Sequence, residues 1–146
     1  MKDLLVKHFN ELELPKPAIE WLLMLWHVTQ VFDDVADGDE VKRDDLDDAI
    51  YFSLVGMNVN AFFKAYSNEL LPVVANFILK WQGSDTVERA GEINETSFVW
   101  RAGYFDVVMM VVLLCHGQEK AKWLSPYVLK MYGEDFQDYV KEFKNG

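Results

Sequence analysis

Apolar residues recur at helical spacing along most of this chain, and this periodicity limits the fold more than any other feature of the sequence. Residues that favour turns are sparse, and runs with the alternating pattern of strands are few. The segment 17–36 is apolar on nearly every side, as a helix surrounded by other helices is. We therefore expect an all-α fold in which residues 17–36 form the central helix.

Proline, glycine and capping residues divide the expected bundle into about six helices. Pro17 suits the first turn of the central helix and Gly38 suits its end. Asp44 or Asp45 suits the N-cap of the next helix, and Gly83 suits the end of the fourth. The expected helices cover residues 2–12, 17–36, 45–67, 71–82 and 85–116, and shorter helices broken near Pro126 and Gly133 cover residues 119–143.

Length and composition predict a single folded domain. A chain of 146 residues can fill one hydrophobic core and is short for two. Half of its residues are apolar, with five Trp, six Tyr and ten Phe, which argues against intrinsic disorder.

The charge distribution limits the classes of partner. The chain carries 24 acidic and 14 basic residues, for a net charge of −10. Such a field repels phosphate groups, and no basic stripe with interleaved aromatic residues is present. We therefore expect no nucleic-acid binding and no attraction to anionic membranes.

The single cysteine and the hydropathy pattern predict a cytoplasmic protein. Cys115 lies within the apolar run 107–115, so an intramolecular disulfide is excluded and a buried, reduced thiol is expected. The first fourteen residues carry charges throughout, unlike a signal peptide, and nine apolar residues in a row are too few to span a bilayer.

The most distinctive local feature is an acidic stretch that follows the central helix. Nine of the sixteen residues from Asp33 to Asp48 are acidic. Carboxylates this close together repel one another, so they require a cation, a basic partner or full solvation. Asp33 and Asp37 lie one turn apart on the same side of a helix, with Asp34 beside them, and hard oxygen ligands at this spacing suit Mg²⁺.

The segment V-F-D-D-V-A-D-G-D-E, residues 31–40, resembles the first aspartate-rich motif of class I isoprenoid synthases, in particular squalene and phytoene synthase-like proteins. The resemblance covers about twenty residues, including the apolar helix that leads into the motif. It implies an all-α fold in which Asp33, Asp34 and Asp37 bind Mg²⁺ and, through it, a diphosphate. The second aspartate-rich motif of that family is not visible in this chain.

A second acidic stripe is expected on the long helix 85–116. Glu88, Glu92, Glu95 and Asp106 fall within about 60° of one another at roughly 100° per residue. Facing the Asp33–Asp37 stripe, these side chains would supply opposing metal ligands, as facing helices of bundles do. The E-x-x-E step from Glu92 to Glu95 is similar to that of all-α nucleotide pyrophosphohydrolases, which bind Mg²⁺.

The second stripe has an alternative interpretation, because runs of charged residues are usually solvated faces. Asp106 fits that alternative less well, because it lies between Phe105 and an apolar run. Arg101, a metal ion or a solvent-facing position must therefore compensate its charge.

Other kinds of chemistry have little support in the sequence. An EF-hand loop starting at Asp33 would place Val35 at a calcium-ligand position and Asp44 where the bidentate glutamate belongs. The three histidines are scattered, without an H-E-x-x-H pattern. No G-x-S-x-G, P-loop or G-x-G-x-x-G motif is present.

Two functional hypotheses remain. In the first, the protein binds a divalent metal ion and acts on or binds a phosphorylated small molecule, with Arg43 or Arg101 meeting phosphate oxygens. In the second, it is a non-enzymatic acidic interaction protein that binds a basic partner and forms a homo-oligomer through an apolar face. The sequence does not choose between them.

Overall fold

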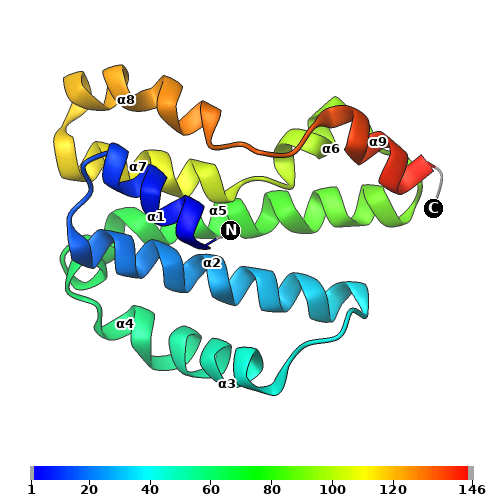
Figure 1. Ribbon diagram of the computed structural model, residues 1–146, viewed down its shortest axis with the longest axis horizontal. Helices are drawn as coiled ribbons and strands as arrows, with labels where there is room; N and C mark the ends of the chain where they lie inside the picture. Colours follow the sequence, from blue (N-terminus) through cyan, green and yellow to red (C-terminus); the bar gives the residue numbers. More distant parts are fainter. Residues whose placement is uncertain (1, 145–146) are drawn as a thin grey trace. The chain divides into compact units, whose positions relative to one another are not determined.

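The fold is described from a computed structural model of the protein, which describes residues 2–144. These residues form helices and their connections without a strand, which confirms the prediction of an all-α fold (Figure 1). No helix among the described residues is both long enough and apolar enough to cross a membrane.

Contacts group the chain into two compact units, which meet between Ser67 and Asn68. The boundary falls within the helix α5, Ala61–Arg89, close to Tyr66, whose backbone dihedrals (φ −127°, ψ 22°) are not helical. We call the parts before and after this boundary the N-terminal and C-terminal units. The division does not test the prediction of a single domain, which stays a prediction.

The N-terminal unit is built around one long helix. Pro17 lies in the first turn of this helix, as predicted, and Gly38 ends it in the left-handed conformation (φ 75°), where its N–H donates to a carbonyl of the last turn. A second helical run, residues 43–59, follows the connection and includes a π-helical turn. The elements before α5 are α1 (Lys2–Glu11), α2 (Lys16–Asp37), α3 (Arg43–Tyr51), the π-helix η1 (Phe52–Gly56) and α4 (Met57–Val59).

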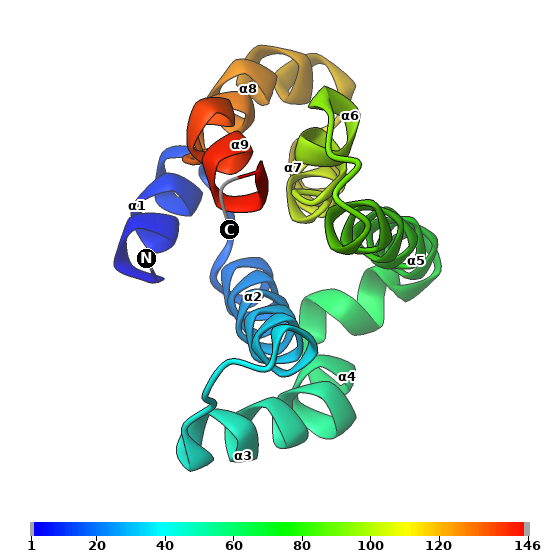
Figure 2. The ribbon, with the colours of Figure 1, turned by 90° about the vertical axis from the view of Figure 1, so that its right-hand side faces the viewer.

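The run from α3 to α4 lies along α2, in the opposite chain direction (Figures 1 and 2). Val28 and Val31 of α2 form a buried cluster with Ala49 of α3. His27 Nε2 lies 2.9 Å from the backbone oxygen of Asp45, which adds a polar contact between the same two helices. Gly56 lies close to α2, since a Cβ there would lie 2.9 Å from Met24 Sδ.

The C-terminal unit contains the rest of α5 and four further helices, α6 (Glu95–Trp100), α7 (Tyr104–His116), α8 (Gln118–Lys130) and α9 (Phe136–Lys144). α8 lies along α7, and α9 contacts α6 (Figures 1 and 2). Gly103, just before α7, allows a close approach to α5, because a Cβ there would lie 2.9 Å from Phe77 Cδ1.

The prediction of one long helix over residues 85–116 is wrong. α5 continues through Gly83 and Ser84 to Arg89, and the chain then turns at Gly91, which has a φ of 73°. A new helix begins after Asn94, whose side chain accepts from the Ser97 N–H while the Ser97 hydroxyl accepts from the Asn94 N–H. This reciprocal capping supplies partners for donors that a helix start leaves unpaired.

Other predicted boundaries are also corrected, and the described helices outnumber the expected six. α3 begins at Arg43, with Lys42 rather than Asp44 or Asp45 at its N-cap position. The expected helix 45–67 is interrupted by η1 and by Asn60, whose backbone is extended (ψ 133°). Pro126 lies inside α8 rather than at a break.

Candidate functional site

The acidic stretch forms a largely exposed surface at the end of α2 and along the start of α3. Seven of its nine acidic side chains are exposed, and the other two, Asp33 and Asp34, are half-buried. We call the group the acidic surface; its members are Asp33, Asp34, Asp37, Asp39, Glu40, Asp44, Asp45, Asp47 and Asp48.

At the end of α2 the local structure strengthens the negative field. The last turn of this helix contains no basic residue. The carbonyl groups at a helix C-terminus carry a partial negative charge, which adds to that of the carboxylates Asp33, Asp34 and Asp37. Gly38 then turns the chain away from the helix axis. A cationic group is therefore electrostatically favoured at this end of the helix.

Along α3 the acids are positioned by the helix itself. Asp44 and Asp45 occupy the first turn, where the positive end of the helix dipole stabilises them. Arg43 Nε donates to Asp47 Oδ1 at 3.1 Å, so the predicted phosphate ligand Arg43 is already in an exposed ion pair. Several other carboxylates of the surface form no ion pair with a described residue, namely Asp39, Glu40, Asp44 and Asp48.

Among residues 2–144, no group of three or more His, Cys, Asp or Glu side chains is arranged to hold a metal ion. The structure therefore gives no support to a Mg²⁺ site at Asp33, Asp34 and Asp37, and the site stays a prediction. Those three residues belong to the N-terminal unit, whereas Glu92, Glu95 and Asp106 belong to the C-terminal unit. The expected convergence of the two acidic stripes likewise stays a prediction.

The residues of the second stripe do not share one helix. Glu92 lies in the connection after α5, Glu95 is the first residue of α6, and Asp106 is in the first turn of α7. Glu92 and Glu95 are exposed. Lys80 Nζ donates to Asp106 Oδ2 at 2.7 Å, so a lysine of α5 compensates the carboxylate for which Arg101, a metal ion or solvent was expected.

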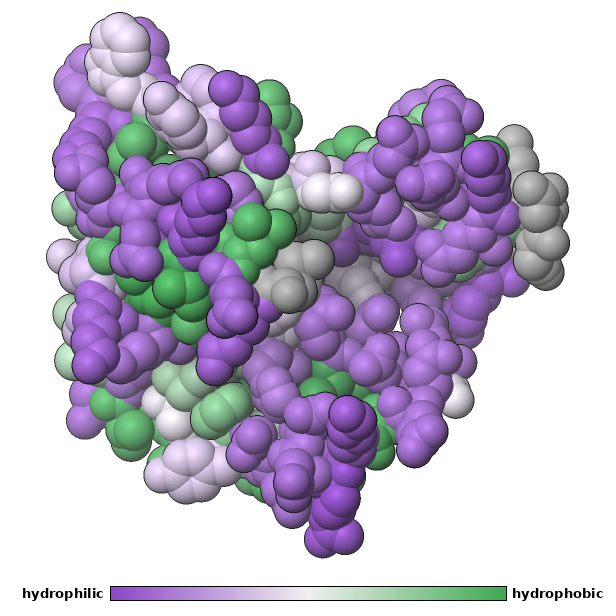
Figure 3. All heavy atoms as spheres, in the orientation of Figure 1, coloured by the Kyte–Doolittle hydropathy of each residue, from purple (hydrophilic) through white to green (hydrophobic). Residues whose placement is uncertain are grey.

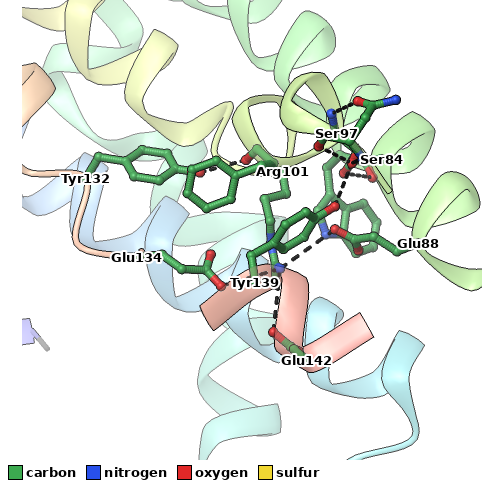
Figure 4. Close-up of polar contacts among 11 residues, drawn as sticks. Ser84, Glu88, Ser97, Arg101, Tyr132, Glu134, Tyr139 and Glu142 are labelled. Carbon is green, nitrogen blue, oxygen red and sulfur yellow. Dashed lines mark hydrogen bonds and ion pairs between the residues drawn. The ribbon is translucent and has the colours of Figure 1, made fainter. Parts of the chain in front are cut away.

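Arg101 lies at the centre of a group of carboxylates that the sequence did not predict (Figure 4). Its Nη1 atom lies 3.5 Å from Glu134 Oε1, 3.7 Å from Glu142 Oε2 and 3.8 Å from Glu88 Oε2. The guanidinium also stacks over the ring of Tyr139, with its Cζ 5.0 Å from the ring centroid. We call Glu88, Arg101, Glu134 and Glu142 the Arg101 cluster.

Aromatic rings and hydroxyl groups pack next to the Arg101 cluster. The Tyr139 hydroxyl lies 2.7 Å from Ser97 Oγ, and both residues are buried. The Tyr132 hydroxyl donates to the backbone oxygen of Phe98 at 2.6 Å, and the Phe98 ring contacts the Tyr132 and Tyr139 rings. These contacts join α6, the connection before α9 and α9 itself, and the Arg101–Glu88 pair adds α5 (Figure 4).

Burial and charge shift the pKa values of this cluster. Burial raises the pKa of the Glu88 carboxyl, although Arg101 partly lowers it, and burial likewise raises the pKa of Glu134. Burial lowers the pKa of Arg101, but the three carboxylates outweigh this effect and raise it overall. Burial and the charge of Glu134 raise the pKa of Tyr132 to about 12.

The Arg101 cluster is best explained as a fold-stabilising group. Three carboxylates already lie around the guanidinium, and they would compete with a phosphate for it. The role of Arg101 as a phosphate ligand therefore has no geometric support and stays a prediction. Glu134, Tyr139 and Glu142 were not predicted, because their partners lie far away in the sequence. The only signal in the sequence was the helical spacing of the aromatic residues in the segment that forms α9, which is typical of a packed face.

Comparison of the chain with protein-family models, with curated proteins and with solved structures found no match.

Proposed function

We propose that this is a non-enzymatic helical interaction protein that binds a positively charged partner through its acidic surface. The observation that supports the proposal is the concentration of nine carboxylates over sixteen residues, seven of them exposed. Lys42 and Arg43 are the only bases within that stretch, so its charge balance is −7. A surface of one sign attracts a partner of the opposite sign and speeds their encounter.

The position of the acids adds to this argument. Carboxylates that stabilise a fold through internal ion pairs are usually at least partly buried. Exposed carboxylates without an internal ion pair can instead bind a group of another molecule. Asp44 and Asp48 lie one helical turn apart on α3, and both are exposed without an internal ion pair. Two basic side chains of a partner at similar spacing would meet this row.

The test uses a soluble Lys- and Ser-containing peptide as the basic probe and measures its affinity by fluorescence anisotropy. Asp44→Asn with Asp45→Asn removes two charges from the first turn of α3. We expect roughly fivefold weaker binding, since exposed ion pairs contribute about 0.2–1 kcal/mol each. Raising the salt concentration should weaken the binding of the unchanged chain as well.

A matched variant controls for total charge. Glu119→Gln with Asp138→Asn removes the same charge from the first turns of α8 and α9, where the helix-dipole contribution is comparable. The proposal requires this variant to bind the probe as the unchanged chain does. Equal weakening by both double variants, or no binding of the probe at all, would contradict a localised acidic docking surface.

A second candidate function, binding of a divalent metal ion and through it a phosphorylated small molecule, rests on the spacing of the aspartates in the sequence and on the negative field at the end of α2. There Asp33 and Asp37 lie one turn apart, and no base lies in the last turn. In this hypothesis Asp33, Asp34 and Asp37 ligate Mg²⁺, and diphosphate cleavage or transfer relies on its charge.

A thermal shift experiment separates the two functions. A metal ion that binds only the native state must raise the unfolding midpoint. If Mg²⁺ or Mn²⁺ raises it, and Asp33→Asn with Asp37→Asn abolishes the increase, the metal hypothesis gains over the interaction hypothesis. If millimolar metal leaves the midpoint unchanged, the metal hypothesis fails.

A further inference from the structure

The helical run 43–59 exposes an apolar face on the side opposite its buried contacts. Its inner side packs against α2 through Leu46, Ala49, Phe52 and Met57. The residues on the other side remain in solvent although they are large and apolar. Their exposed fractions are 49 % for Ile50, 59 % for Tyr51, 72 % for Leu54, 39 % for Val55 and 57 % for Val59. We call these five residues the apolar face.

The backbone that carries the apolar face is held by specific contacts. The π-helical turn η1 adds a residue to this part of the run, and Asn58 Nδ2 donates to the backbone oxygens of Ser53 and Leu54. π-Helical turns occur frequently at functional sites. The turn lies close to α2 at Gly56, since a Cβ there would meet Met24 Sδ at 2.9 Å. The apolar face is therefore part of an ordered helix and not of a loose loop.

The same run is acidic at its beginning and apolar at its end. Asp44, Asp47 and Asp48 are exposed near its start, and the apolar face follows directly. Figure 3 shows hydrophilic residues over the start of α3 and hydrophobic and intermediate residues toward α4. A binding partner that covers the whole run would thus meet carboxylates first and apolar side chains afterwards.

We propose that the run 43–59 binds an amphipathic helical segment of another protein, with Lys or Arg residues opposite the acids and apolar residues opposite the apolar face. This inference rests on the proposed function and specifies the partner. Amphipathic helices bind apolar surfaces through anchor side chains spaced three or four residues apart. The apolar face contains residues at a similar spacing, with Leu54 four residues after Ile50 and Val59 four residues after Val55. Charge complementarity fixes the basic end of the partner.

The charges of the run argue against other occupants. A second copy of this chain would bring its own acids to the same surface, where like charges repel. An anionic lipid surface is repelled for the same reason. A basic segment gains from the charges and from the apolar area together.

The test compares three Lys- and Leu-containing peptides of equal composition and of a length that covers residues 43–59. Two are helices in which one face carries Lys toward one end and Leu toward the other, in the two opposite orders, while the other face is polar; the third is a scrambled sequence. We expect one of the two ordered peptides to bind about tenfold more tightly than the scrambled peptide, because only it buries the apolar face. Isothermal titration calorimetry measures the affinities.

Variants with matched exposure locate the binding. Leu54→Ser should weaken the preferred peptide about fivefold and leave the scrambled peptide unaffected, since Leu54 is 72 % exposed and contributes little to the fold. Leu129→Ser on α8 is the control, because Leu129 is similarly exposed at 75 % and lies in the other unit. This control should change neither affinity.

The outcomes separate this inference from the proposed function. Equal, salt-sensitive binding of all three peptides would overturn the amphipathic partner and leave the basic partner in place. Absence of binding by every peptide would overturn both. Sedimentation of the chain as a dimer that Leu54→Ser dissociates would instead assign the apolar face to a second copy and would also overturn this inference.

Discussion

At the scale of single residues, Arg101 pairs with three carboxylates from different parts of the C-terminal unit. It compensates Glu88, which is only 10 % exposed, together with Glu134 and Glu142. We predict that Arg101→Met lowers the free energy of unfolding by roughly 3 kcal/mol, because it leaves a largely buried carboxylate without its cation. Urea denaturation measures this loss.

Arg89→Met is the matched control for Arg101→Met. Arg89 makes an ion pair with Asp85 on the same helix, and its side chain is 70 % exposed. Such pairs contribute roughly 0.5 kcal/mol, so this variant should stay close to the unchanged chain. Similar losses in the two variants would contradict a central structural role for Arg101.

Glu88 gives the Arg101 cluster a defined pH dependence. Burial raises its pKa above the ordinary value of 4.5, with partial opposition from Arg101 and reinforcement from Asp85 and Glu142. The folded state therefore binds the proton of the Glu88 carboxyl more tightly than the unfolded state does. The resulting contribution to the free energy of unfolding is fully present below the ordinary pKa. It is lost as the pH rises through the raised pKa.

We therefore predict that the free energy of unfolding of the unchanged chain, relative to that of Glu88→Gln, falls as the pH increases from about 4 to 7. Burial also raises the pKa of Glu134, so Glu134→Gln should show the same direction. Urea denaturation across this pH range measures both differences. An increase with pH would mean that the charged form of Glu88 is the one that the fold stabilises.

Some of the residue contacts could be predicted from the sequence and others could not. The sequence indicated that Asp106 needs compensation, and the structure supplies it through Lys80, a residue that the sequence did not single out. Cys115 was expected to be buried, but its side chain is half-buried, and this partial burial raises the pKa of the thiol. The Arg101 cluster could not be predicted from the sequence, because it forms only when α9 packs near α5 and α6.

At the scale of elements, two glycines have opposite roles. Gly91 lies in the left-handed region with a φ of 73°, whereas Gly83 lies inside α5, where a Cβ would meet only Trp100 at an ordinary 3.6 Å. We predict that Gly91→Ala lowers the free energy of unfolding by about 1 kcal/mol and that Gly83→Ala raises it by about 0.5–1 kcal/mol. Urea denaturation distinguishes the signs, and a loss on Gly83→Ala would contradict a continuous α5.

This contrast also explains which helices the sequence could predict. Hydrophobic periodicity and the Gly38 stop were enough for α2, because the glycine and the end of the apolar run coincide. Gly83 is an equally plausible stop by composition, yet α5 continues through it. Tertiary contacts with other helices determine whether a glycine ends a helix, and these contacts cannot be read from a single sequence.

At the scale of the whole molecule, the all-α prediction is confirmed, whereas its division into helices is corrected. The fold class follows from summed periodicity and composition, which tolerate local errors. The second acidic stripe depended on one continuous helix from residue 85 to residue 116, so a single break at Gly91 removed its common face. The acidic residues between Asp33 and Asp48 still form one surface, because they are neighbours in the sequence and do not depend on a single continuous helix.

The central claim is that the acidic surface, continued by the apolar face, is where this protein meets a basic partner. Chemical-shift mapping of the isotope-labelled chain during titration with the preferred Lys- and Leu-containing peptide tests it most directly. The account predicts that the largest changes in backbone amide signals fall within residues 33–59. Changes concentrated in α8 or α9, or spread evenly over both units, would contradict it.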